Sequence, residues 1–174
     1  KAIEGYVASH DYVKVHVLEN SAVTIYYSEV SVWDGTDVWN GTSNVATSLD
    51  SLGGSGTQAD PYIINEAQDL VTIANIVNSL PGGGSSALIK GKYFKMTKSI
   101  DLNNHPLYIG GFSGWGNRQI FNGHLDGNNC SIRGINNDRA LFGCIEGTVT
   151  NLSIYGKVYN DQGVGNEAGL VGYL

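Results

Sequence analysis

Short runs of alternating apolar and polar residues recur along the chain, and they predict short β-strands. Residues 13–17 alternate valine with polar neighbours, and residues 22–27 form a β-branched and aromatic run. Beyond residue 91, similar runs such as residues 93–96 and 99–102 are each followed by turn residues. A period of two is typical of strands that bury one face. The chain is therefore predicted to be mainly β.

Residues 65–80 have a helical period instead. Apolar side chains recur at intervals of three and four residues and share one helix face; they are Ala67, Leu70, Val71, Ala74 and Val77. Asn65 is expected as the N-cap, with Gln68 completing a capping box, and Pro81 ends the helix. We expect this helix to cover the open end of a stack of strands.

A short phrase near the C-terminus almost repeats. Residues 140–145 are similar in sequence to residues 169–174, and Ser131–Gly134 is similar to Ser153–Gly156. A segment that repeats at this spacing has to stack on its own copy to bury its apolar face. The sequence therefore predicts a β-solenoid, and Leu170 and Leu174 at its open end favour end-to-end self-association.

The chain divides into three predicted parts. Residues 1–32 read as the C-terminal strands of a truncated module, and residues 33–60 as a linker rich in Gly, Ser and Asn. Residues 61–174 hold the helix and the stacked strands. Gly5-Tyr6, the Val15-x-Val17-x-Glu19-Asn20 run and the residues 23–30 are similar to the end of mucin-binding-type (MucBP) β-grasp repeats of Gram-positive surface proteins.

A second resemblance covers residues 53–174. Its blocks are Asp60-Pro61-Tyr62-Ile63-Ile64, Tyr93-Phe94-Lys95-Met96, Phe121-Asn122-Gly123-His124-Leu125-Asp126-Gly127, Ala140-Leu141-Phe142-Gly143 and Gly169-Leu170-Val171-Gly172. Together they resemble the opening of GLUG-motif proteins, found in bacterial surface adhesins and in some secreted IgA-cleaving metallopeptidases. The resemblance implies an all-β fold: a right-handed parallel β-helix with an N-terminal capping helix and a small antiparallel β piece before it.

Composition and charge disfavour some classes of function. The net charge is −6 and no basic stripe occurs, which disfavours nucleic-acid binding and attachment to anionic membranes. The 24 glycines and the few charged residues, 15% of the chain, are typical of a secreted β-protein. Two cysteines, Cys130 and Cys144, do not form a disulfide framework, and whether they are free or bridged stays open.

Candidate catalytic groups do not form a complete set. Asp101 and Asp126 are the carboxylates that a β-helix glycosidase or lyase could pair, and the alternative is that each one caps a turn. The four histidines show no metal spacing, and Asp126, Asn128 and Asn129 lack the later ligands of an EF-hand. No His-Glu-x-x-His peptidase motif occurs. We therefore expect no catalytic residue, no metal and no cofactor.

Aromatic residues in loops are the candidate ligand-binding groups. They lie among Gly, Asn and Asp, and they are Trp33, Trp39, Tyr108 and Trp115. Flat rings beside amides and carboxylates can stack on sugars, and the alternative is that each ring packs under its own loop. The favoured function is a stalk or adhesin of a large cell-surface or secreted bacterial protein, which presents a binding surface to host glycan or extracellular matrix. The alternatives are a carbohydrate-active β-helix enzyme and an accessory region of an IgA-cleaving metallopeptidase.

Overall fold

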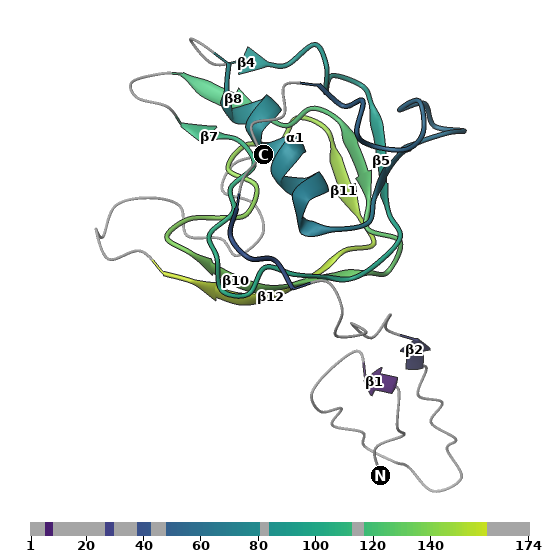
Figure 1. Ribbon diagram of the computed structural model, residues 1–174, viewed down its shortest axis with the longest axis vertical. Coiled ribbons are helices and arrows are strands. Elements are labelled where there is room, and N and C mark those ends of the chain that lie inside the picture. The colour runs from purple at the N-terminus through teal and green to yellow at the C-terminus, as the bar shows by residue number, and fades with distance from the viewer. Residues whose placement is uncertain are drawn as a thin grey trace, which may run out of the picture.

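The computed structural model describes residues 6–8, 27–29, 38–42, 48–80, 84–112 and 117–159. The elements are β1 (Tyr6–Ala8), β2 (Tyr27–Glu29), β3 (Tyr62–Ile64), α1 (Ala67–Asn78), β4 (Gly84–Ser85), β5 (Tyr93–Met96), β6 (Ile100–Asp101), β7 (Gly111–Phe112), β8 (Arg118–Ile120), β9 (His124–Asp126), β10 (Ser131–Asn137), β11 (Thr148–Thr150) and β12 (Ser153–Val158). Parallel pairing in the order β11-β9-β5-β3 forms one sheet, and the order β12-β10-β6 forms a second. Figure 1 shows β5 and β11 on one side of α1 and the strands β10 and β12 on another.

The prediction of an all-β right-handed parallel β-helix is wrong. Within the described ranges the sheets are separate and mixed: β8 pairs in parallel with β4 and antiparallel with β7. Strand β7 begins at a glycine pair, Gly110 and Gly111, both at positive φ, where the chain can turn sharply into the strand. Helix α1 also belongs to the core, since eight of its residues are buried. No closed solenoid is found in these parts of the chain.

The predicted stacking of similar segments is confirmed for one of the two pairs, Ser131–Gly134 and Ser153–Gly156. Strands β10 and β12 pair in parallel, with Ser131 opposite Ser153 and Ile132 opposite Ile154. Ile132 also pairs with Ile100 of β6, so aliphatic residues from three strands align. Residues 169–174, the copy of residues 140–145, lie outside the described residues, as do residues 13–17 and the leucines of the predicted self-association.

Helix α1 begins one residue later than the sequence pattern suggests. Glu66 is the N-cap, in place of the predicted Asn65, and Asp69 completes the capping arrangement in place of Gln68. Asp69 Oδ2 accepts hydrogen bonds from the backbone N–H groups of Asn65 and Glu66, at 2.8 and 3.2 Å. A carboxylate in the first turn also compensates the positive end of the helix dipole. Partial burial raises the pKa of Asp69, and the two backbone hydrogen bonds oppose this rise.

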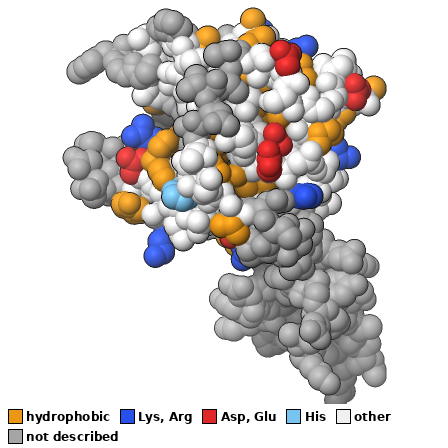
Figure 2. Space-filling view, viewed as in Figure 1, with side chains coloured by type: hydrophobic (Ala, Val, Ile, Leu, Met, Phe, Trp, Pro, Cys, Tyr) orange, Lys and Arg blue, Asp and Glu red, His pale blue; other side chains and the backbone are white. Residues whose placement is uncertain are grey.

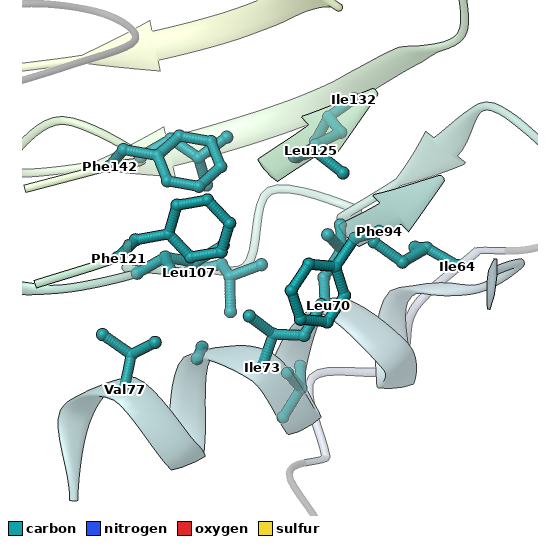
Figure 3. Packing of buried hydrophobic residues seen from close by; sticks show 14 of the residues in the cluster. Ile64, Leu70, Ile73, Val77, Phe94, Leu107, Phe121, Leu125, Ile132 and Phe142 are labelled. Atoms are coloured by element: carbon teal, nitrogen blue, oxygen red, sulfur yellow. The ribbon is translucent and has the colours of Figure 1, made fainter. Parts of the chain in front are cut away.

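The apolar face of α1 packs against aromatic side chains from later strands. Figure 3 shows Leu70, Ile73 and Val77 of α1 directed towards Phe94 and Phe121. The rings of Phe94, Phe121 and Phe142 follow one another, with centroids 6.1 and 5.4 Å apart. Each of the three side chains is no more than 1% exposed. The helix, the parallel sheets and the loops around Phe121 and Phe142 therefore share one core.

Candidate functional site

The outer face of the sheet β3-β5-β9-β11 carries a groove with a volume of about 510 Å³. One wall is the loop before β3, and the floor is the four strands. Its polar and aromatic lining groups include Gln58, Tyr93, Lys95, His124, Asp126 and Thr148. The lining side chains on β5 and β9 face outwards because they alternate with the buried residues Phe94, Met96 and Leu125.

Register places the lining side chains in two rows across the strands. Tyr93, His124 and Thr148 are direct neighbours on β5, β9 and β11. The rings of Tyr93 and His124 lie 4.6 Å apart at 32°, and His124 Nδ1 is 3.0 Å from the Thr148 hydroxyl oxygen. The second row joins Lys95 to Asp126. A stacked ring pair therefore lies beside a cation and a carboxylate.

Asp126 is held in place by hydrogen bonds to one of its oxygens. Oδ1 accepts from the Asn128 backbone N–H and from the Asn151 side-chain amide, both at 2.9 Å. These bonds, that from Asn151 foremost, lower the pKa of Asp126; the charge of Lys95 lowers it further, and burial opposes the shift. Asp126 Oδ2 has no hydrogen-bond partner among the described residues, so an ionised oxygen is left for a ligand.

This arrangement makes the stability of the protein, relative to Asp126→Asn, dependent on pH. The folded-state pKa lies below the unfolded value of about 3.9, so the ionised carboxylate stabilises the fold above that pH. That contribution, under about 1 kcal/mol for a partly exposed group, is expected to vanish as the pH falls through the folded-state pKa. Urea unfolding of both proteins between about pH 6 and about pH 2.5 measures it. A difference that stays constant over this range would contradict the assignment.

Trp39 is part of the packed structure. Its ring is half-buried against the core and lies edge-on to His105, with centroids 5.5 Å apart. Its indole N–H donates to the Thr42 carbonyl at 2.9 Å, and its backbone N–H donates to Asp101. A smaller hollow of about 300 Å³ lies beside it, next to the first residues of α1. The indole is thus held by its own loop, by His105 and by the core, and it also lines this hollow, so its part in ligand binding stays a prediction.

Tyr108 is held in a surface cluster with Asp138 and Arg139. Its phenol lies near the Asp138 carboxylate, and the Arg139 guanidinium lies 4.9 Å from the ring centre. Partial burial, followed by the carboxylate of Asp138, raises the pKa of Tyr108. One face of the ring is therefore covered by Arg139. Tyr108 does not line the hollow beside Trp39, and Trp33 and Trp115 lie outside the described residues.

The two aspartates of the enzyme hypothesis are not brought together. Asp101 lies on β6 and pairs with Arg133, whereas Asp126 lies on β9 in a different sheet. Asp101 Oδ1 accepts the Asn103 backbone N–H at 2.7 Å, the same turn that Asp126 makes with Asn128. Both carboxylates therefore cap turns, as the alternative interpretation expects.

The described parts of the chain contain neither a cluster of metal-binding side chains nor a membrane-spanning helix. No group of three or more His, Cys, Asp or Glu side chains lies close enough together there to hold a metal ion. No helix there has the length and the apolar character needed to cross a bilayer. Cys130 and Cys144 are free thiols, each 2% exposed.

The sequence contained a signal for the groove that aromatic content alone did not reveal. Tyr93-Phe94-Lys95, His124-Leu125-Asp126 and Thr148-Val149-Thr150 share one polar–apolar–polar pattern, or its aromatic equivalent. When such triplets pair in parallel, their outer residues form rows across the sheet. Their pairing, which a single sequence does not fix, is what turns three separate triplets into one site.

Comparisons with known proteins do not assign this chain to a protein family. No protein-family model matches the chain, and no solved structure matches it. Among curated proteins, the chain is similar to one from Evansella cellulosilytica named "Putative Gly-rich membrane protein", with 33% identity over 123 residues. That similarity covers 64% of this chain and 13% of the relative. No catalytic family is thereby identified, and the GLUG and MucBP resemblances stay predictions.

Proposed function

We propose that this chain is a non-catalytic segment of a bacterial cell-surface or secreted protein, and that it binds glycan through the groove on the sheet β3-β5-β9-β11. The observation that carries the proposal is the composition of the groove. An aromatic ring, Tyr93, lies there beside the ammonium group of Lys95 and the free carboxylate oxygen of Asp126. Sugars offer an apolar ring face together with hydroxyl groups that both donate and accept, and this set of groups matches them.

The character of the surface and the similar protein agree with an envelope location. Figure 2 shows charged side chains dispersed over the visible described surface, with uncharged polar groups and backbone between them. Such a surface does not attract nucleic acid or anionic lipid by charge. The relative from Evansella cellulosilytica is named a membrane protein, and we propose that this chain likewise belongs to the cell envelope. Repeated weak contacts along a large parent protein would then provide avidity for host glycan or matrix.

A glycan-array screen of the chain, followed by titration of each positive glycan, tests the proposal. We expect selective binding that Tyr93→Ala weakens about fivefold, since a ring contact contributes about 1 kcal/mol. Tyr155→Ala is the matched control, because Tyr155 is 51% exposed on β12 of the other sheet. No binding by the parent chain, or equal weakening by both variants, would refute a glycan site in this groove.

A further inference from the structure

The charges of the side chains that line the groove indicate which class of glycan it binds. Its lining includes two formally charged side chains among the described residues, Lys95 and Asp126, which are neighbours on β5 and β9. Their charges cancel, so the groove has no net attraction for an anion. The carboxylate is moreover fixed by two hydrogen bonds, which keep it in the groove. A uronate or sialate chain would meet this carboxylate at close range, and like charges at short distance are unfavourable.

A neutral polyol satisfies both groups together. The Lys95 ammonium has three N–H donors, and no hydrogen bond or ion pair engages it within the described residues. Asp126 Oδ2 accepts but cannot donate when ionised. Two hydroxyl groups on neighbouring sugar carbons can accept from Lys95 and donate to Asp126 at the same time. A hydrogen bond from a sugar hydroxyl to a charged side chain such as Lys95 or Asp126 is stronger than one to a neutral side chain.

The extent of the groove sets the length of the ligand. Lining residues run from Gln58 and Pro61, before β3, to Thr148 and Thr150 on the edge strand β11. Four strands span roughly 14 Å at the usual spacing between strands. A hexopyranose unit is about as long as one such spacing, so a monosaccharide that contacts Tyr93 does not reach Thr150. Only a chain of several sugars is long enough to contact both Tyr93 and the edge strand β11.

We propose that the groove binds a neutral polysaccharide whose chain runs across the strands, from the loop before β3 to β11. His124 covers one face of Tyr93, and the opposite face of Tyr93 stacks on a sugar ring. Lys95 and Asp126 bind adjacent hydroxyl groups of the next unit. Thr148 and Thr150 extend the contacts to the edge of the sheet. This inference rests on the proposed function, since it names the class of glycan that the same groove takes.

Calorimetric titration with two size ladders tests the inference. One ladder contains neutral gluco-, manno- and xylo-oligosaccharides from one to six units, and the other contains oligogalacturonates of the same lengths. We expect affinity for at least one neutral series to rise with length until the four strands are covered and then to level off. Binding of that series is expected to change less than about twofold on raising the salt concentration, because no net charge is neutralised.

Three variants and one control test whether the ligand contacts the named residues. Lys95→Met keeps the aliphatic stem and removes the donors, and it should weaken neutral binding about tenfold. Tyr93→Phe should weaken it less than Tyr93→Ala, because the ring is kept, and Tyr155→Ala should leave it unchanged. Thermal unfolding of each variant confirms that it folds, and Lys95→Met, on an outward-facing side chain, is the variant least disturbing to the core.

The outcomes separate this inference from the proposed function. Length-dependent neutral binding that Lys95→Met weakens about tenfold supports both. Binding of oligogalacturonates in place of the neutral series overturns the neutral-polysaccharide inference and leaves a glycan-binding function standing. Equal affinity for one unit and for six overturns the extended mode of binding. Failure of every oligosaccharide and every arrayed glycan to bind overturns both.

Discussion

Phe121→Ala is expected to lower the free energy of unfolding by about 3–5 kcal/mol, the usual cost of removing a buried phenylalanine. Phe121 is 1% exposed and lies between Phe94 and Phe142, so truncation removes two ring contacts and leaves a cavity. Figure 3 places the ring between Phe142 and the side of the core formed by Leu107 and Val77. This is where the helix meets the layers of the later strands, so the cavity would loosen both.

The measurement is urea or thermal unfolding of the parent and the variant. A loss of this size corresponds to a fall in Tm of about 6–20 °C for a domain of this length. Phe112→Ala is the matched control: Phe112 is 50% exposed, and its ring has the Arg118 guanidinium 5.7 Å from its centre. That variant should lose less than about 1 kcal/mol. Similar losses in the two variants would mean that the row of rings is not the centre of the core.

Strands were predictable where local pattern and burial agree. Residues 93–96 were predicted as a strand and form β5 with the same bounds, because alternate residues enter the core. Helix α1 was predicted for the same reason, since its apolar stripe is buried. Its cap was misplaced by one residue because Asn65, Glu66, Gln68 and Asp69 all carry groups that can cap. The hydrogen bonds to Asp69, which depend on the exact turn, decide among them.

The architecture was harder to predict because it depends on pairing between distant residues. Nothing local to Gly110 and Gly111 shows that β7 pairs back onto β8 and that β8 also pairs with β4. Glycines mark many of the turns, but they do not mark all of them. Asparagines occupy several positive-φ positions, among them Asn103, Asn128 and Asn151. Gly147, in contrast, has no positive φ and is needed for space, since a Cβ there would collide with the carbonyl oxygen of Gly123.

The candidate site, like the architecture, depends on pairing between distant residues that local sequence does not reveal. Trp39 and Tyr108 were chosen because aromatic residues in loops are typical of binding sites, yet both rings are engaged within the structure. Tyr93 and Lys95 give no local sign of a binding site, because each is an ordinary outward residue of a short strand. They become a site only when β9 aligns His124 and Asp126 beside them. A binding surface built across strands is therefore invisible to any argument that considers one strand at a time.

A buried amide supports the second large expected effect. Asn137, the last residue of β10, is 0% exposed and faces the backbone of Leu107. Its Oδ1 accepts the Leu107 N–H at 3.1 Å, and its Nδ2 donates to the Leu107 carbonyl at 2.7 Å. The side chain thus replaces a strand partner for a residue that lies between β6 and β7. Because the site is closed to water, each of these backbone groups depends on Asn137.

Asn137→Leu is expected to destabilise the fold by about 2–6 kcal/mol, although leucine has the same branched outline as asparagine. Two buried backbone groups lose their partner, at about 1–3 kcal/mol each. Asn137→Asp should be at least as damaging at neutral pH, because it removes the donor to the Leu107 carbonyl and buries a charge. Acid should relieve the second variant and not the first, since a protonated carboxyl regains a donor. Asn136→Leu is the matched control, one residue away and half-buried. Urea unfolding of the three variants at neutral and acid pH separates the amide's hydrogen bonds from simple packing, because packing alone would make Asn137→Leu about as mild as Asn136→Leu.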